Sequence, residues 1–395
     1  MTVTTSTRAG WVVREVDERA GDSAPDLPLL SVSEYRGVVP RRDDGEGQAA
    51  SEDLSHYKVC RPEDIVLNRL WAFRGGLGRS PVKGLVSPDY AVLRPEPGTN
   101  PRFLNYLFRS PTFVAEMAAR SRGIGGIDAS NGRSPRINMI DFNAIEIDLP
   151  SLEVQRRVAD FLDDQTARIH TLIVKNKRVM ALLDERARAI VSERLPLDAP
   201  RVPIWLLADI NPEALSDETG PDTTINYIDI GAVTTGRMAS PPEPMEFGDA
   251  PSRARRVLKP GDILVSTVRT YLRAIVNIAE GAPANLIGST GFAVLRPRPV
   301  ITTRYMMYAC LNDGFISEVE ARSDGVSYPA ISATAVGEVR IPVPDALAQE
   351  EIVCELEAAT EKVNALTRRV QDQIDLLAER KQALITAAVT GQLDI

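Results

Sequence analysis

The sequence predicts an α/β (α+β) protein made by internal duplication: two similar globular domains, each followed by a long helix, in a pseudo-twofold arrangement. Three observations predict this fold. A stretch that begins at Ile147 returns at Ile341, an offset of 194 positions. Each copy contains a long helical run without internal proline or glycine. The segments before the two copies also repeat one order of strand and loop motifs, so the whole chain is a tandem repeat.

Each long helix has a recognisable start and end. Ser151 and Asp345 are good N-cap residues, and each directly follows a proline. The first run stops at Leu195-Pro196 and the second at Gly391, a natural residue for the position after a helix. Each helix is therefore about 45 residues, or about 65 Å, long. A typical globular helix has about 11–12 residues.

The apolar residues of both runs recur with a period near 3.5, which is typical of a coiled-coil seam. The predicted seam of the first helix is Leu162, Gln165, Ile169, Leu172, Asn176, Val179, Leu183, Arg186 and Ile190. That of the second helix is Ile352, Leu356, Ala359, Val363, Leu366, Val370, Gln373, Leu377, Arg380 and Leu384. We interpret the polar members Gln165, Asn176 and Gln373 as residues that fix the register. A second interpretation is two unrelated long helices on globular domains.

These runs divide the chain into a first domain (1–150), a first helix (151–195), a second domain (196–343) and a second helix with a tail (344–395). Inside the domains, the turn at 62–67 matches that at 260–265 with an offset of 198. The strand at 90–95 matches that at 292–297 with an offset of 202. The domains therefore differ in loop length, and loops on a rigid scaffold are where recognition is usually carried.

Composition limits the class of protein. The net charge is −8 and neither domain is strongly basic, so any DNA binding must use local arginine clusters. Three scattered cysteines and two histidines favour a reducing cytoplasm without disulfides and argue against a zinc site. The sequence has neither an apolar run of membrane-spanning length nor a signal peptide, so we expect a cytoplasmic protein.

Catalytic motifs are missing from the sequence. There is no Gly-x-Gly-x-x-Gly after a strand and no Walker A sequence. Asn211-Pro212-Glu213 does not complete the motif with which amino-methyltransferases hold a target amine. A metal nuclease needs clustered carboxylates with a lysine; Glu63-Asp64 has no such partner nearby, and the repeat at Gly261-Asp262 lacks the glutamate, so we interpret both aspartates as turn residues. We therefore expect a chain that is not itself an enzyme.

Arginine-rich loops are the best candidates for function, because a guanidinium forms paired hydrogen bonds with phosphates and guanine edges. The alternative is solvated surface charge. The candidates in the first loop of each domain are Arg69, Arg74, Arg79 and Lys83, and Arg269, Thr270, Tyr271 and Arg273. A second variable loop adds the weaker candidates Asn131, Arg133, Ser327 and Tyr328. A further cluster that could hold phosphate, or be an ordinary surface loop, is Arg253, Arg255, Arg256 and Lys259.

The chain resembles the specificity (S) subunit of type I restriction–modification systems. The resemblance rests on the helix lead-ins at 149–155 and 343–349, the turn at 261–264 and the tail at 384–393, and it covers essentially the whole chain. No single motif is decisive, but the order domain, helix, domain, helix is specific. One departure is Glu63, which stands where the family often has glycine before aspartate.

The resemblance implies that each domain is a target recognition domain reading one half of a bipartite site in double-stranded DNA. The two helices would form an antiparallel coiled coil that spaces the domains. Two modification (methyltransferase) subunits, and then restriction subunits, would assemble on this chain. S-adenosylmethionine, ATP and Mg²⁺ would belong to those partners, and this chain would hold no cofactor. The alternatives are a duplicated scaffold that holds protein partners without reading DNA, and a remnant of a combined methyltransferase–specificity enzyme, against which the missing catalytic motifs weigh.

Overall fold

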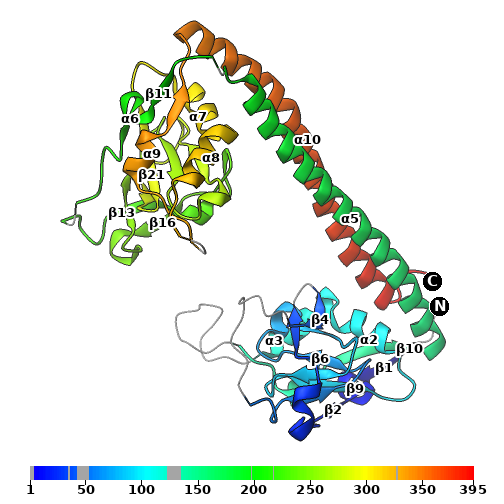
Figure 1. Ribbon diagram of the computed structural model, residues 1–395. Coiled ribbons are helices and arrows are strands. Elements are labelled where there is room, and N and C mark those ends of the chain that lie inside the picture. Colours follow the sequence, from blue (N-terminus) through cyan, green and yellow to red (C-terminus); the bar gives the residue numbers. More distant parts are fainter. Residues whose placement is uncertain are drawn as a thin grey trace. The chain divides into compact units, whose positions relative to one another are not determined.

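The computed structural model (Figure 1) describes residues 4–33, 36–41, 53–121, 135–196, 198–216, 218–325 and 328–395. The chain divides into two compact units. Unit 1 comprises residues 1–176 and 372–395, and unit 2 comprises residues 177–371. Each unit therefore contains one globular domain, the start of one long helix and the end of the other.

The two long helices are α5 (Leu152–Arg194, 43 residues) and α10 (Ala346–Val389, 44 residues). Their N-caps are those expected from the sequence. The Ser151 hydroxyl accepts a bond from the backbone N–H of Val154 (3.5 Å), and the Asp345 carboxylate accepts one from that of Ala348 (2.9 Å). After α10, Gly391 has a left-handed backbone (φ 72°). Two long helices and two sheet-containing domains confirm the predicted fold class.

Inside each unit the two helical segments run side by side (Figure 1). In unit 1, Val158 and Leu162 of α5 share a buried cluster with Ile385 and Val389 of α10. In unit 2, residues near the end of α5, Ile190 among them, share a cluster with residues near the start of α10. The beginning of one helix therefore meets the end of the other in each unit, and the segments are antiparallel.

The residues that form the seam between the two helices are not all those predicted: every second seam position is shifted by one residue, which we call a different phase. Leu172 (48% exposed), Val179 (42%) and Leu366 (47%) face solvent. Side chains turned away from solvent in α5 are Leu162, Thr166, Ile169, Ile173, Asn176, Met180, Leu183, Ala187 and Ile190. Those in α10 are Leu356, Thr360, Val363, Thr367, Val370, Ile374, Leu377, Lys381 and Leu384.

The physical reason for this correction is the order of spacings within a heptad. Seam positions can be spaced by three and then four residues, or by four and then three, and the two choices share every second position. An apolar pattern with a period near 3.5 therefore fits both choices. The predicted choice placed Arg186, Gln373 and Arg380 in the seam, and all three are exposed. Asn176 remains a seam residue, and the two seams coincide when shifted by 194 positions.

The domain of unit 1 is built on a four-stranded antiparallel sheet in the order β2-β9-β6-β7. Its strands are β2 (Val13–Val16), β9 (Ala91–Pro95), β6 (Ile65–Leu67) and β7 (Leu77–Arg79). Three smaller antiparallel pairs are β1 (Thr4–Arg8) with β10 (Glu146–Pro150), β3 (Leu30–Ser33) with β4 (Gly37–Pro40), and β5 (Lys58–Cys60) with β8 (Gly84–Val86). The helices are α1 (Ala9–Val12), α2 (Pro101–Phe108), α3 (Pro111–Arg120) and α4 (Met139–Asn143), with 3₁₀ turns η1 (Gly21–Asp26) and η2 (Ala72–Arg74).

Unit 2 repeats this plan with the sheet β12-β21-β18-β19 and the pair β11·β22. Its bounds are β11 (Arg201–Pro203), β12 (Ala208–Ile210), β18 (Ile263–Ser266), β19 (Ile275–Asn277), β21 (Phe292–Pro297) and β22 (Arg340–Pro342). The helices are α6 (Ile204–Leu207), α7 (Thr303–Leu311), α8 (Asp313–Ala321) and α9 (Ala333–Glu338), and the 3₁₀ turns are η4 (Ile230–Ala232), η5 (Phe247–Asp249) and η6 (Thr270–Leu272).

The second sheet is where the domains differ most. In unit 2 it has the order β16-β13-β20-β17, and β13 runs parallel to β20. Its strands are β13 (Thr224–Ile228), β16 (Glu243–Glu246), β17 (Ala254–Val257) and β20 (Leu286–Ser289), and a separate hairpin is β14 (Val233–Thr234) with β15 (Arg237–Met238). In unit 1 the described residues contain the matching pair β5·β8, an antiparallel bridge between Arg19 and Lys58, and a single parallel bridge between Leu29, which directly precedes β3, and Leu85.

A buried glutamine joins each domain to its helix. Gln155 is 1% exposed; its side-chain oxygen accepts a bond from Asn100 N (2.8 Å), and its amide donates to Pro150 O (2.8 Å). Gln349 does the same with Thr302 N (3.1 Å) and with the carbonyl of the proline before α10 (3.0 Å). Because Asn100 and Thr302 are the N-caps of α2 and α7, each glutamine ties a domain helix to the base of a long helix.

Each turn aspartate anchors a buried ion pair. Asp64 (3% side-chain exposure) accepts two hydrogen bonds of 2.9 Å from Arg94. Asp262 (0%) accepts bonds of 2.7 and 2.8 Å from Arg296. These hydrogen bonds raise the pKa of both arginines. The interpretation of Asp64 and Asp262 as turn residues agrees with these contacts, and the contacts give both a packing role in the domain core.

The residue before each aspartate has a left-handed backbone. Glu63 has φ 75° and Gly261 has φ 86°. Glycine adopts this conformation freely, whereas a residue with a Cβ is strained by about 1–2 kcal/mol. Glu63 forms an ion pair with Arg79, which partly offsets the strain.

Candidate nucleic-acid interface

The arginine-rich segments form one structural feature in both units, a 3₁₀ turn after a central strand of the four-stranded sheet. Turn η2 follows β6, and η6 follows β18 at an offset of 198 positions. Each turn ends in a left-handed residue, Gly75 (φ 74°) in unit 1 and Arg273 (φ 52°) in unit 2. Arg273 therefore occupies the position of Gly75. The two turns share the 3₁₀ conformation and its left-handed end but enter it differently, because Trp71 has φ −114° and Arg269 has φ 50°.

In unit 1, Arg74 is exposed, and its guanidinium lies 5.9 Å from the ring centre of Trp71 and 5.3 Å from that of Phe73. Trp71 is itself 49% exposed. Arg79 is engaged elsewhere, in the ion pair with Glu63. The turn thus presents one cation stacked on aromatic rings, an arrangement suited to phosphates and to base faces.

Two other candidates of unit 1 differ in environment. The Arg69 guanidinium donates to Ile137 O (3.4 Å), and burial, together with the nearby charge of Arg136, lowers the pKa of Arg69. Lys83 is exposed in the connection between β7 and β8. Arg69 therefore contributes to internal packing, whereas Lys83 is free to reach a ligand.

In unit 2, Arg269 is exposed and its guanidinium lies 5.0 Å from the ring centre of Tyr328. The Arg269 backbone N–H donates to Pro329 O (2.8 Å), which holds the two loops together. Tyr328 (68% exposed), Tyr271 (53%) and Leu272 (50%) face solvent. The same kind of surface, a cation against an aromatic ring, thus appears with different residues.

The remaining unit 2 candidates make internal contacts. Thr270 is 5% exposed, and its hydroxyl lies 3.1 Å from that of Ser323. Arg273 donates to the Asp313 carboxylate (2.7 Å). Asn131, Arg133 and Ser327 lie outside the described residues. Exposure therefore separates Arg74, Lys83, Arg269, Tyr271 and Tyr328 from the other described candidates, and their binding roles remain predictions.

Sequence reasoning missed the aromatic half of this surface in unit 1. Trp71 and Phe73 were not among the predicted residues, although Trp71 is one of three tryptophans in the chain and adjoins the arginine-rich loop. An aromatic residue beside arginines after a strand was the available signal. Its exposure was not visible in the sequence, because such residues are usually buried.

Two of the four residues in the basic cluster at β17, Arg253 and Lys259, are paired with carboxylates of their own domain. Arg253 bonds with the Tyr227 hydroxyl (3.1 Å) and the Asp229 carboxylate (2.5 Å). Lys259 pairs with Glu213. Burial lowers the pKa of Arg256. This cluster is a weaker candidate for phosphate binding than the turns.

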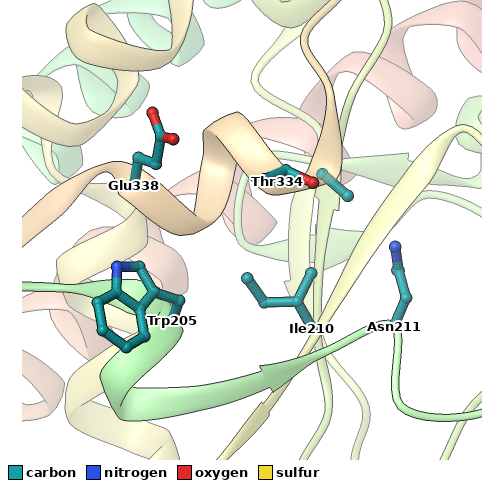
Figure 2. A pocket seen from close by; sticks show the side chains of 6 residues that line it. Trp205, Ile210, Asn211, Thr334 and Glu338 are labelled. Carbon is teal, nitrogen blue, oxygen red and sulfur yellow. The ribbon is translucent and has the colours of Figure 1, made fainter.

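An open hollow of about 320 Å³ lies beside α6 and α9 of unit 2 (Figure 2). Its lining residues are Trp205, Ile210, Asn211, Ala333, Thr334 and Glu338. Within the described ranges, no group of three His, Cys, Asp or Glu residues is placed to hold a metal ion. Across those same ranges, no helix combines the length and apolarity needed to cross a membrane.

Comparisons with known proteins place the fold. No protein-family model matches the sequence, and a search of curated proteins returned no match. The chain is similar to one from a study of the structural basis underlying complex assembly and conformational transition of the type I R-M system. That chain is 20% identical, with a TM-score of 0.65, and the match covers 99% of this chain and 98% of that one.

Two further similar structures are the HsdS subunit from Thermoanaerobacter tengcongensis and the type I restriction–modification S subunit from M. genitalium. The first is 21% identical with a TM-score of 0.46 and covers 99% of this chain and 97% of that chain. The second is 13% identical with a TM-score of 0.38 and covers 100% and 97%. The match at 0.65 carries the structural argument: the resemblance inferred from the sequence is confirmed at the level of the fold.

Proposed function

We propose that this chain is a DNA sequence-specificity protein that reads a site in two halves and performs no catalysis itself. The observation that carries the proposal is the pair of exposed arginine–aromatic turns at equivalent places on a duplicated scaffold. Equivalent placement gives both domains one mode of approach to a ligand. Different side chains in the two turns give each domain its own preference, because base-specific contacts depend on residue type.

More particularly, we propose the specificity subunit of a type I restriction–modification complex. Its recognition domains would lie within residues 1–150 and 196–343, and the helices at 151–195 and 344–395 would space them. Two modification subunits and, where present, restriction subunits would assemble on it in the cytoplasm. S-adenosylmethionine, ATP and Mg²⁺ would be held by those partners. The shared fold with a chain of a type I R-M system supports this proposal.

The experiment is selection of bound DNA by the chain assembled with modification subunits of the same host. Double-stranded oligonucleotides with random sequence should yield two conserved blocks separated by a spacer of fixed length. Binding should weaken steeply with salt, since phosphate contacts release counterions. An assembled complex that enriches no sequence would contradict the proposal.

A second candidate is a duplicated scaffold that holds protein partners without reading DNA. It is favoured by the net charge of −8 and by the internal ion pairs of Arg79, Arg253 and Arg273. The same selection separates the two functions: a scaffold would assemble its partners normally and leave the DNA pool unchanged.

A further inference from the structure

Two arginines flank turn η6, and they differ in what they bind. Arg273 donates to the Asp313 carboxylate (2.7 Å), and its side chain is partly buried. Arg269 is exposed, and within the part of the chain that the structure describes it forms no ion pair. Arg269 therefore supplies the guanidinium of this turn that a ligand can reach.

The backbone of Arg269 has an unusual conformation. It is left-handed (φ 50°, ψ 49°), which costs a residue with a Cβ about 1–2 kcal/mol. The Arg269 N–H donates to Pro329 O (2.8 Å), and its carbonyl accepts a bond from Leu272 N (2.8 Å). Strain of this kind persists only where the surrounding structure holds it, and it is concentrated at functional sites. The point from which the side chain leaves the turn is therefore fixed.

A neighbouring loop orients the guanidinium of Arg269. The loop is closed at its base, because Asp324 and Ala330 exchange two backbone hydrogen bonds of 2.9 Å. It carries Tyr328, whose ring centre lies 5.0 Å from the guanidinium. Cation–π attraction holds a guanidinium in such a place and uses none of its five N–H donors. The donors of Arg269 can therefore bind a ligand while the ring keeps the group in place.

The surroundings of Arg269 suit the edge of a base better than a phosphate. Surfaces that bind phosphates gather several cations. The exposed neighbours of Arg269 are instead Tyr271, Leu272 and Tyr328. Guanine presents the acceptors O6 and N7 side by side in the major groove, and the fork of an arginine matches that pair. One oriented guanidinium among apolar and aromatic side chains is therefore placed to read a guanine.

Unit 1 has a different residue at this point of the turn. At an offset of 198 positions, Trp71 corresponds to Arg269, and Arg74 corresponds to Leu272. The side chain of Arg74 thus leaves its turn three positions later than that of Arg269. A contact made from the position of Arg269 has no counterpart in unit 1, so it concerns one half-site only.

We propose that unit 2 reads a guanine, with Arg269 donating two hydrogen bonds to O6 and N7 of that base in the major groove. This inference rests on the proposed function and names one base of the half-site that unit 2 reads. Arg269 determines specificity at that position, and Tyr328 is a positioning residue that orients the guanidinium. The half-site of unit 1 is read without this contact.

The test uses the full chain assembled with the modification subunits of the same host. Selection of bound DNA with the unmodified chain gives two half-sites, and selection with Arg269→Ala identifies the half-site that depends on Arg269. That half-site should contain a guanine whose enrichment is lost in the variant, and affinity for the selected site should fall about tenfold or more. The matched control is Arg298→Ala, because Arg298 is a surface arginine paired with Asp209.

Altered bases probe the same contact without changing the protein. 7-Deazaguanine has C–H in place of N7, whereas inosine keeps O6 and N7 and lacks only the amino group in the minor groove. At the selected guanine, 7-deazaguanine should weaken binding by the unmodified chain about fivefold or more, and inosine should leave it within about twofold. With Arg269→Ala, neither replacement should have a further effect.

The role of Tyr328 is tested by base preference. Tyr328→Ala should relax the preference for guanine at that one position and leave the other positions of both half-sites unchanged. Tyr328→Phe keeps the ring and should restore the preference. A Tyr328→Phe variant that behaves like Tyr328→Ala would contradict the positioning role.

The outcomes separate this inference from the proposed function. A half-site that depends on Arg269 but contains no guanine, or 7-deazaguanine bound as well as guanine, would overturn the inference alone. A loss that is uniform across sequences, with a salt slope lower by about one, would also overturn it, because that behaviour marks a phosphate contact. A complex that selects no sequence at all would contradict the proposed function and this inference together.

Discussion

The joint between domain and helix and the 3₁₀ turn after the central strand have diverged to different degrees. At the joint, Arg102 bonds with Asp163 of α5 (2.7 Å), and the equivalent Arg304 pairs with Glu357 of α10. The buried glutamines make the same two bonds in both units. At the turn, the 3₁₀ conformation and its left-handed end are kept, while the residue before the turn differs in conformation and the cations and aromatic rings occupy different positions.

This difference shows which contacts stayed the same while the two copies of the domain diverged. Residues at the joint are constrained from both sides. The Tyr106 hydroxyl, for example, donates to Asp163 (2.7 Å), and burial raises the pKa of that hydroxyl to about 12. A change at the buried glutamines, Gln155 and Gln349, leaves a polar group unpaired away from water, which costs about 1–3 kcal/mol. Exposed turn residues have no such partner to lose, so they could diverge.

The largest expected effect comes from breaking the ion pair that both domains share. Asp64→Ala and Asp262→Ala should each lower the free energy of unfolding by about 3 kcal/mol, because a partly buried arginine loses its bidentate partner. Urea denaturation followed by hydrogen exchange would show which unit opens. Strongly unequal losses would contradict the structural equivalence of the two turns. The control is Asp198→Ala, at an exposed position in the connection between α5 and β11 of unit 2.

The second-largest effect concerns the 3₁₀ turns, whose side chains differ between the two units. Arg74→Ala should weaken recognition of one half-site, and Arg269→Ala that of the other, by about 1–3 kcal/mol each. Affinities of the assembled complex for DNA with one half-site randomised would measure this. Arg298→Ala is the control, because Arg298 is a surface arginine paired with Asp209. Equal loss at both half-sites from either variant would refute separate reading.

A smaller effect tests the phase of the helix seam. Ile173→Ala should cost about 1–2 kcal/mol, because half-buried apolar surface is lost. Leu172→Ala, one residue away on the exposed face, should stay within about 0.5 kcal/mol of the unmodified chain. Thermal or urea unfolding of the two variants decides the phase, and a larger loss at Leu172 would restore the seam predicted from the sequence.

The smallest effect sharpens the comparison at one backbone position. Gly261→Ala should destabilise unit 2 by about 1 kcal/mol, since its left-handed backbone disfavours a Cβ. Glu63→Gly should relieve the same strain in unit 1 and lose the exposed pair with Arg79, for a net gain below about 1 kcal/mol. Urea midpoints measure both changes, and a clear loss from Glu63→Gly would show that the ion pair outweighs the strain.

The sequence was informative where a signal is local or repeated. Pro150 and Pro344, the caps after them and the uninterrupted runs were enough to predict both long helices. The phase of their seam was not predictable, because Leu172 and Ile173 are both apolar and only packing distinguishes them. At the candidate site, residue type identified Arg74 and Arg269, but the partner of Arg273, Asp313, is 40 residues away in sequence. Such a contact becomes known only from the fold.

The division of the chain has a consequence for the order in which the protein matures on the ribosome. All of unit 2 lies within residues 177–371, so it can close once those residues have emerged. Unit 1 contains the first residues to be made, yet Ile385 and Val389 belong to its buried cluster. The half that is translated first therefore completes its core last, and a premature stop near the end of translation damages the N-terminal half while sparing its neighbour.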